Sequence, residues 1–432
     1  MLGKVVATKA EPGDGSLPPL SMGIAAFSTI VEWYDFTLYL YFAATLARVF
    51  FGGGAGSLAT TLAGFAVAYV MRPLGALAFG HIGDRFGRRR MMLASVALMT
   101  AAMLAIALLP TRATVGPVAG WLLIVLRCVM GFAVGGEYTG VVAYLMEGAP
   151  EGRRGLITSL AAAASEVGGL LAVGLAALTV SYFAPPELDA WGWRVPFFVG
   201  AALAGSVWIA RAHVHESPEF DRQLASGTVP VSPLGHALAR HRAGIARGFA
   251  ISALGSITYY VGISYVPAFL SSIGRMGEAV SLGLSTIAAG AVIAVTPLVG
   301  LASDRFGRRP VLIGFCLLGA ALPIAMFGWM ASGSVGAALV GAVVLAGVAG
   351  GVSAVGAVAT AEQLGGEGRL TGLALGATSA TAIFGGLTPY VAQVATERSG
   401  WPAVPGAMIA VVALAVLPVL WTMPETAPGN IL

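Results

Sequence analysis

The sequence predicts an all-α membrane protein with twelve transmembrane helices in two six-helix halves. Of its 432 residues, 57% are hydrophobic and only 10% are charged, whereas soluble globular proteins carry about a quarter charged residues. Several uncharged apolar runs reach the roughly 20 residues with which a helix crosses about 30 Å of hydrocarbon. One charged loop sequence also occurs twice. A soluble enzyme is therefore excluded, and a transmembrane barrel would instead alternate apolar and polar residues.

The apolar runs give the order of the spans. Six fall in a first half at 21–212, with spans at 21–46, 57–80, 91–110, 117–147, 155–183 and 194–212. After a polar linker at 213–243, a second half at 244–423 has spans at 244–270, 280–302, 310–331, 334–361, 371–396 and 403–423. Tails at 1–20 and 424–432 complete the predicted organisation. The first run is too long for a signal-peptide core, so we expect it to remain as a span.

The basic residues predict the orientation of these spans. Seventeen of the 24 Lys and Arg residues fall on the side of the N-terminus, five fall on the opposite side, and Arg72 and Arg127 lie within spans. Because cytoplasmic loops are enriched in Lys and Arg, both termini and the linker are predicted to be cytoplasmic. The basic residues form no continuous face, so the pI near 9.2 does not indicate nucleic-acid binding.

The repeated loop supports two related halves. The sequence GHIGDRFGRR at 80–89 recurs as GLASDRFGRR at 300–309, displaced by 220 residues. Asp84 can face a helix N-terminus of the other half, while Arg88 and Arg89 can pair with acids or anionic lipid head groups. We expect these loops to act as a latch on the outward-open state, with gating residues Asp84, Arg85, Arg88, Arg89, Asp304, Arg305 and Arg308. The arginines fix the topology in either case.

These loops resemble the signature loop of the major facilitator superfamily. More narrowly, EWYDF at 32–36, RPLG at 72–75, GGEYTG at 135–140 and WGWRVPF at 191–197 are similar to the metabolite:proton symporter family. The resemblance implies the major facilitator fold and a proton symporter of the bacterial inner membrane. Members carry citrate, alpha-ketoglutarate, shikimate and proline or betaine. The segment TAIFGGLTP at 381–389 looks most like the citrate and tricarballylate carriers.

Five charged residues lie near mid-depth of their predicted spans: Glu32, Asp35, Arg72, Arg127 and Glu166. Charges at this depth are costly and usually functional. Three carboxylates face two guanidinium groups, so one carboxylate lacks a partner and is expected to take a proton. Glu32 and Asp35 are three residues apart and share a helix face with Tyr39, which we predict to point into a cavity.

The pairing of these charges leaves alternatives open. The resemblance to proton-coupled sugar carriers implies that Asp35 and Arg127 form the ion pair that carries the proton. This pair, or a pair of Arg72 with Glu32, could instead only hold helices together. Glu166 could tune substrate or proton number, or stay protonated and hydrogen-bonded to a neighbouring helix.

A sixth acid, Glu137, lies deeper toward the cytoplasmic side within a glycine-rich segment. Small residues let helices approach closely in membranes. We therefore favour a gating or packing role for Glu137 over direct proton transfer.

The predicted substrate follows from the arginines. Arg72 and Arg127 are the only mid-depth cations, so we expect them to bind a carboxylate. The second half contributes neutral groups that can hydrogen-bond substrate, chiefly Tyr259, Tyr260, Thr378 and Gln393, with one of the two adjacent tyrosines facing the site. A di- or tricarboxylate is the leading substrate. The alternatives are a zwitterion such as proline or betaine, a shikimate-like acid, or antiport of a drug or metabolite.

No cofactor or metal site is predicted. The five histidines lie in loops or the linker, and Cys128 and Cys316 lie within apolar runs, where buried thiols are expected. No phosphate-binding loop of an ATPase occurs. The expected partners are therefore an organic acid, protons and membrane lipid, with no nucleic acid, and the protein is expected to be a monomer.

Overall fold

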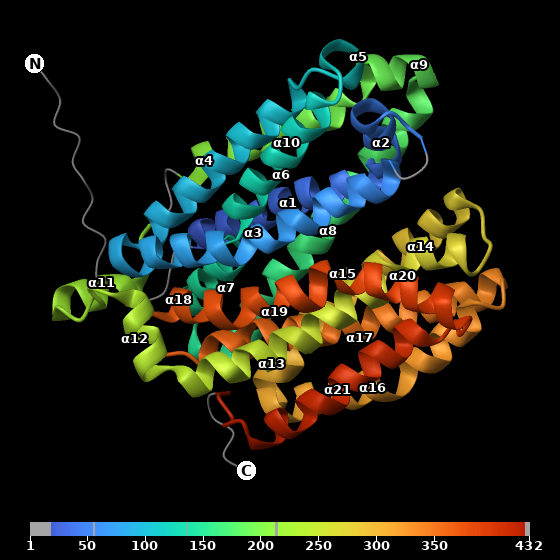
Figure 1. The fold of residues 1–432 in the computed structure, drawn as a ribbon. Helices are drawn as coiled ribbons and strands as arrows, with labels where there is room; N and C mark the ends of the chain where they lie inside the picture. Colours follow the sequence, from blue (N-terminus) through green and yellow to red (C-terminus); the bar gives the residue numbers. More distant parts are fainter. Residues whose placement is uncertain (1–18, 55–56, 136, 212–214, 428–432) are drawn as a thin grey trace, which may run out of the picture.

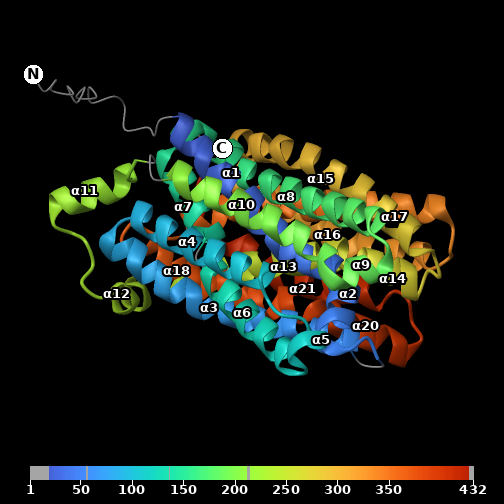
Figure 2. The same cartoon turned by 90° about the horizontal axis from the view of Figure 1, so that it is seen from above.

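Two helical bundles lie side by side in the computed structural model (Figure 1). The structure describes residues 19–54, 57–135, 137–211 and 215–427, and in these ranges the chain is helical with no strand. Helices α11 (Pro218–Ser226) and α12 (Pro233–Arg240) lie at one end of the molecule, which we call the linker end (Figures 1 and 2). The predicted tail at 1–20 and the end of the tail at 424–432 fall mostly outside the described residues.

The first bundle comprises the helices up to Arg211. They are α1 (Pro19–Tyr41), α2 (Ala43–Phe51), α3 (Ser57–Phe86), α4 (Arg88–Ala107), α5 (Arg112–Val115), α6 (Val118–Val134), α7 (Glu137–Gly148), α8 (Arg154–Tyr182), α9 (Pro185–Glu187) and α10 (Arg194–Arg211). The short helices α5 and α9 lie with α2 at the end opposite the linker end (Figure 1).

The second bundle follows the linker. Its helices are α13 (Arg242–Tyr259), α14 (Val266–Ser272), α15 (Glu278–Phe306), α16 (Arg308–Met330), α17 (Val335–Glu362), α18 (Arg369–Leu373), α19 (Ser379–Thr381), α20 (Thr388–Ser399) and α21 (Val404–Thr422). Helix α8 packs against α15 and α17, so the two bundles share an extended interface.

The number of apolar helices agrees closely with the predicted spans. Ten helices of the described residues are long and apolar enough to cross a membrane, and an eleventh is reached if Arg242–Ser264 and Val266–Ser272, bent by 43°, count as one. The first predicted span corresponds to α1 and α2, which are not among these. Helix α1 carries Glu32 and Asp35 and packs along α8 and α10 inside the first bundle.

Four predicted spans are not continuous α-helices: besides the span at 21–46, which comprises α1 and α2, and that at 244–270, which comprises α13 and α14, two more are interrupted. The span at 117–147 consists of α6 and α7, and the span at 371–396 consists of α18, α19 and α20, joined by π-helical segments at 374–378 and 382–386. Glycines in the second of these segments permit close contacts, because Gly385 lies against the ring of Tyr260 and Gly386 against the ring of Tyr69. Such π-helical turns occur frequently at functional sites.

Close backbone approaches hold the charged helices of the first bundle together. A Cβ atom on Gly131 of α6, or on Gly135 directly after it, would overlap the backbone of Ala68 or Arg72 of α3. A Cβ atom on Gly168 of α8 would likewise overlap the backbone of α1 at Ile30. These small residues bring α3, α6 and α8 within side-chain reach of the acids on α1.

Candidate functional site

Asp35 and Arg127 form a buried ion pair between α1 and α6. Arg127 Nη1 lies 3.4 Å from Asp35 Oδ2, and both side chains are at most 1% exposed. The ring of Tyr39 lies 4.4 Å from the Arg127 guanidinium, and its hydroxyl donates to the carbonyl of Thr61 at 2.9 Å. Asp35 Oδ1 and Arg127 Nε have no hydrogen-bond partner within the described chain, so the pair has unused hydrogen-bonding capacity.

A second buried pair joins α1 to α3. Arg72 Nη2 lies 3.3 Å from Glu32 Oε1, and the Arg72 guanidinium lies over the rings of Phe36 and Tyr69 at 5.2 and 5.4 Å. Aromatic faces attract guanidinium groups, and this attraction is stronger away from water. The structure therefore brings together both ion pairs that the sequence suggested.

A cavity of about 150 Å³ lies between the two bundles. Its lining side chains in the first bundle include Trp33, Arg72, Tyr138, Ser165 and Glu166, and those in the second include Ser256, Tyr259, Tyr260, Thr378 and Thr381. Arg72 is the one basic side chain and Glu166 the one acid among the described residues that line it. The cavity therefore offers one basic and one acidic side chain.

Several predicted site residues lie outside this lining. The shared face of Glu32 and Asp35 was expected to point into the cavity, but neither acid lines it, and neither does Tyr39 or Arg127. The reason is electrostatic, because a buried carboxylate requires a partner and both acids turn to arginines inside the first bundle. Trp33, between the two acids in sequence, lines the cavity in their place.

The second bundle differs from expectation in two respects. Both Tyr259 and Tyr260 line the cavity, although one of them was predicted to do so. They border it on two sides, since Tyr259 contacts Trp33 and Tyr260 contacts Tyr69. Gln393 does not line it, because its amide oxygen accepts from Tyr265 at 2.6 Å and its nitrogen donates to Glu397 at 2.6 Å.

Aromatic side chains connect the bundles beside the cavity. The hydroxyl of Tyr69 donates to that of Tyr260 across the interface. The ring of Trp33 meets that of Tyr259 edge-on at 5.2 Å, and the ring of Phe36 lies 4.9 Å from that of Tyr69. The Tyr69–Tyr260 and Trp33–Tyr259 contacts join the two halves, whereas the Phe36–Tyr69 contact lies within the first half.

Glu137 lies in a polar cluster inside the first bundle. It forms an ion pair with Arg211 of α10 and accepts a hydrogen bond from Ser95 of α4 at 2.5 Å. Arg211 also donates to the carbonyl of Met92 and to the hydroxyl of Ser28. Glu137 therefore links helices of one half. This arrangement is consistent with a packing role, which is one of the two roles favoured from the sequence.

Asp84 connects the two halves at the linker end. Its carboxylate accepts hydrogen bonds from the backbone of Leu370 at 3.3 Å and of Thr371 at 2.9 Å, at the start of α18, and from the Thr371 hydroxyl at 2.8 Å. A helix N-terminus leaves backbone N–H groups unpaired and attracts negative charge. Asp84 thus occupies the position predicted for it.

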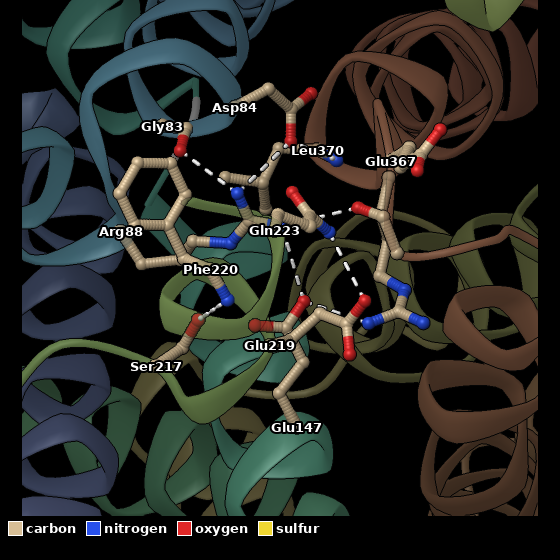
Figure 3. Close-up of polar contacts among 12 residues, drawn as sticks. Gly83, Asp84, Arg88, Glu147, Ser217, Glu219, Phe220, Gln223, Glu367 and Leu370 are labelled. Carbon is tan, nitrogen blue, oxygen red and sulfur yellow. Dashed lines mark hydrogen bonds and ion pairs between the residues drawn. The ribbon is translucent and has the colours of Figure 1, made fainter. Parts of the chain in front are cut away.

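Arg88 organises the charges around Asp84 (Figure 3). It is fully buried and lies 3.3 Å from Asp84 and 3.2 Å from Glu147, and it donates to the carbonyl of Gly83 at 2.9 Å. Arg369 of the second half donates to the same Glu147 at 2.7 Å. Glu147 therefore joins arginines from both halves.

The second half repeats this arrangement. Asp304 accepts from the backbone N–H groups of Gly155 and Leu156, at the start of α8, at 2.8 Å each. Arg308 lies 2.7 Å from Asp304 and 3.2 Å from Glu362. Each half therefore places one aspartate at a helix N-terminus of the other.

The remaining predicted gating arginines have different positions. Arg85 and Arg305 are exposed and lie over the rings of their neighbours Phe86 and Phe306, at 5.5 and 5.6 Å. The Arg89 side chain is also exposed, while its backbone N–H points to Glu216 at 3.3 Å. None of these three side chains contributes to the contacts of Asp84 or Asp304 described above.

Two carboxylates that cap helix N-termini were missed by sequence reasoning. Glu216 accepts from the backbone N–H of Arg88 at 2.8 Å, at the start of α4, and Glu425 accepts from that of Arg308 at 2.8 Å, at the start of α16. Burial raises the pKa of the Glu216 carboxyl, although the N–H groups of Ser217, Arg89 and Arg88 act in the opposite direction. The available signal was that each glutamate follows the sixth span of its half.

Comparisons with known proteins agree with this architecture. The family description "Sugar (and other) transporter" matches residues 22–225, and "Major Facilitator Superfamily" matches residues 276–431. The chain is 30% identical to the ectoine/proline transporter ProP of Corynebacterium glutamicum, over 91% of this chain and 82% of that protein. It is 32% identical to the alpha-ketoglutarate permease of Escherichia coli, over 85% of each chain.

A solved structure matches nearly the whole fold. The proton:xylose symporter XylE, bound to 6-bromo-6-deoxy-D-glucose, superposes with a TM-score of 0.80 and 19% identity, over 94% of this chain and 96% of that chain. The two-bundle architecture is therefore that of a known transporter fold.

Proposed function

Since the chain belongs to the major facilitator superfamily, a family of membrane transporters rather than enzymes, we propose that it is a proton-coupled symporter of a small organic solute with a carboxylate group. It is a multi-pass membrane protein with bacterial relatives. We place it in the bacterial inner membrane with both termini and the linker end facing the cytoplasm, following the excess of basic residues in its predicted inner loops.

The observation that carries this proposal is the cavity between two repeated bundles with crossed contacts at one end. Its lining comes from both halves, so rocking one half against the other would open it alternately to each side. The contacts of Asp84 and Asp304 with the opposite half hold the linker end together. We call these two contacts the latch and propose that it stabilises the outward-facing arrangement.

We propose that Asp35 carries the proton and that Arg127 controls its release. The pair is fully buried but lies outside the cavity lining, so proton and substrate would occupy separate sites. When Asp35 is protonated, Arg127 loses its partner, and the helices α1 and α6 that bear the pair can rearrange. Glu32 and Glu166 are the other acids available for this role.

The substrate carboxylate is proposed to bind at Arg72, the basic side chain of the cavity. Tyr259, Tyr260 and Thr378 can hydrogen-bond the same ligand from the second half. Arg127, Tyr39 and Gln393 are left out of the proposed substrate site because they do not line the cavity. A di- or tricarboxylate would have one arginine to neutralise it here, and that arginine already pairs with Glu32.

Uptake by the purified protein in proteoliposomes tests the proposal. An imposed inward proton gradient should drive accumulation of at least one solute among alpha-ketoglutarate, citrate, shikimate, proline and glycine betaine, and an uncoupler should abolish it. Uptake that ignores the gradient would contradict proton coupling. Solute movement opposite to the proton would instead indicate an antiporter.

A further inference from the structure

Glu166 differs from the other buried acids of the described chain because it forms no ion pair there. Glu32, Asp35, Asp84, Glu137 and Glu166 are buried as whole residues, and the side chains of Glu147, Asp304 and Glu362, which each pair with an arginine, are also at most 5% exposed. The first four each form an ion pair with an arginine. Glu166 has no ion pair within the described residues and is 6% exposed, at the wall of the cavity. The Glu166 carboxylate has a hydrogen bond with Tyr259 but no cationic partner among the described residues, so this site is suited to an incoming cation.

Aromatic side chains surround this carboxylate. The side chain of Tyr259 forms a hydrogen bond with it, and Tyr138 lies close enough to interact with its charge. Trp33 meets Tyr259 at 5.2 Å and Tyr138 at 6.5 Å, with its ring steeply inclined to both. All three rings line the cavity together with Glu166. We call Trp33, Tyr138, Tyr259 and Glu166 the aromatic corner.

The chemistry of the aromatic corner favours an organic ammonium group over a bare ion. The faces of Trp and Tyr attract cations by their quadrupoles, and quaternary ammonium groups are recognised in proteins by such rings. A carboxylate adjoining the rings adds direct charge attraction. An alkylated ammonium also buries its methyl groups against the rings, which a hydrated metal ion does not.

Arg72 provides the basic side chain of the same cavity. It enters from α3, whereas Glu166 enters from α8, so one small ligand can contact an anionic and a cationic group at once. A zwitterion adds no net charge to a cavity that already has Glu32 and Glu166 nearby. Alpha-ketoglutarate would add two negative charges there.

We propose that the transported solute is a small zwitterion, with its carboxylate at Arg72 and its alkylated ammonium in the aromatic corner at Glu166. This inference rests on the proposed symport function and names the substrate class of the same cavity. Glu166 then acts as a specificity-determining residue. Its carboxylate can bind either a proton or the substrate ammonium group, but not both at once.

The test uses a pair of ligands that differ in one charge. Glycine betaine and tert-butylacetate have the same shape and the same carboxylate, but a carbon atom replaces the ammonium nitrogen in the second. Binding of each to the purified full-length protein is measured by calorimetry, with L-proline as a second zwitterion. We expect tert-butylacetate to bind roughly tenfold more weakly than betaine or worse, which corresponds to about 1.4 kcal/mol.

Variants assign this difference to residues. Glu166→Gln should lower the affinity for betaine roughly tenfold and leave that for tert-butylacetate unchanged or improved. Trp33→Leu should lower betaine affinity roughly 2- to 30-fold, the range of a cation–π contact. Glu187→Gln, the same substitution at an exposed residue of α9, should change neither.

The outcomes separate this inference from the proposed function. Equal binding of betaine and tert-butylacetate, or an unchanged betaine affinity in Glu166→Gln, overturns the aromatic corner as an ammonium site. If neither zwitterion binds while alpha-ketoglutarate binds and its uptake follows the proton gradient, the zwitterion assignment fails and symport stands. The comparison of the two ligands on the unmodified protein remains decisive even if a variant does not fold.

Discussion

The Asp84 carboxylate of the first half and the backbone and hydroxyl of Thr371 in the second half are joined by two hydrogen bonds, at 2.9 and 2.8 Å. The two residues lie on helices α3 and α18, far apart in the sequence and in contact at the linker end. Because Asp84 has 0% exposure and also pairs with Arg88, the contact depends on the charge and the shape of the carboxylate.

Asp84→Asn should therefore slow transport. The amide cannot satisfy both backbone N–H groups and leaves Arg88 without one of its charged partners, which destabilises the closed linker end. We expect the maximal uptake rate to fall several-fold with little change in substrate affinity, measured by initial-rate uptake and by equilibrium binding. Asp221→Asn, on an exposed position of α11, is the matched control. Unchanged transport kinetics would mean that the loop determines the topology and does not act as a latch.

Asp35→Asn should abolish proton-driven accumulation while the protein remains folded. The amide keeps the shape of the side chain but cannot exchange a proton, and Arg127 would retain a hydrogen-bond acceptor. Exchange of labelled for unlabelled substrate in the absence of a gradient should survive. Full gradient-driven accumulation by this variant would move the proton to Glu32 or Glu166.

Arg72→Lys and Arg127→Lys should have different consequences. Lysine keeps the charge but loses the planar fork and the stacking on Phe36 and Tyr69, so Arg72→Lys should weaken substrate binding roughly tenfold, about 1.4 kcal/mol. Arg127 does not line the cavity, so Arg127→Lys should alter the coupling ratio of protons to substrate more than the affinity. The reverse pattern in binding and flux measurements would place the substrate at Arg127.

The elevated pKa of Glu216 leads to a prediction about stability and pH. A carboxyl whose pKa is raised by folding contributes stability below its unfolded pKa, and this contribution is lost as the pH rises through the folded pKa. Glutamine mimics the neutral form and can still accept from the N–H of Arg88. Glu216→Gln should therefore gain thermal stability relative to the unmodified protein as the pH rises from about 4.5 to 7.

Thermal unfolding of both proteins in detergent across this range measures the difference. Glu219→Gln, on the neighbouring helix α11, gives a comparison that lacks the contact with the start of α4. A difference that moves in the opposite direction would mean that the hydrogen bonds to Glu216 outweigh its burial.

Sequence reasoning succeeded for features that depend only on position along the chain. Hydropathy placed the spans along the chain, and the repeated loop located Asp84 and Asp304, because both signals are local. Depth along a helix also placed Asp35 and Arg127 near one level. It could not predict whether their side chains face the cavity or the interior of the first half, since this depends on the rotation of α1 against α3 and α6.

Other features arise only from packing. Nothing in the sequence indicated that Arg211, at the end of the predicted span 194–212, pairs with Glu137; the two are buried together because α10 packs on α4 near Met92. The caps formed by Glu216 and Glu425 join segments that are 128 and 117 residues apart, and no periodic pattern encodes such distances. Glu166 was visible in the sequence as an acid at mid-depth of its span, whereas its aromatic surroundings required the fold.

The latch has a property that neither bundle has alone. Asp84 of the first half binds a helix N-terminus of the second, and Asp304 of the second binds a helix N-terminus of the first. Each half thus both supplies an aspartate and receives one, and we expect the two contacts to form and break together. Closure is therefore cooperative, so that in a double-mutant cycle the second neutralised aspartate would add less than the first.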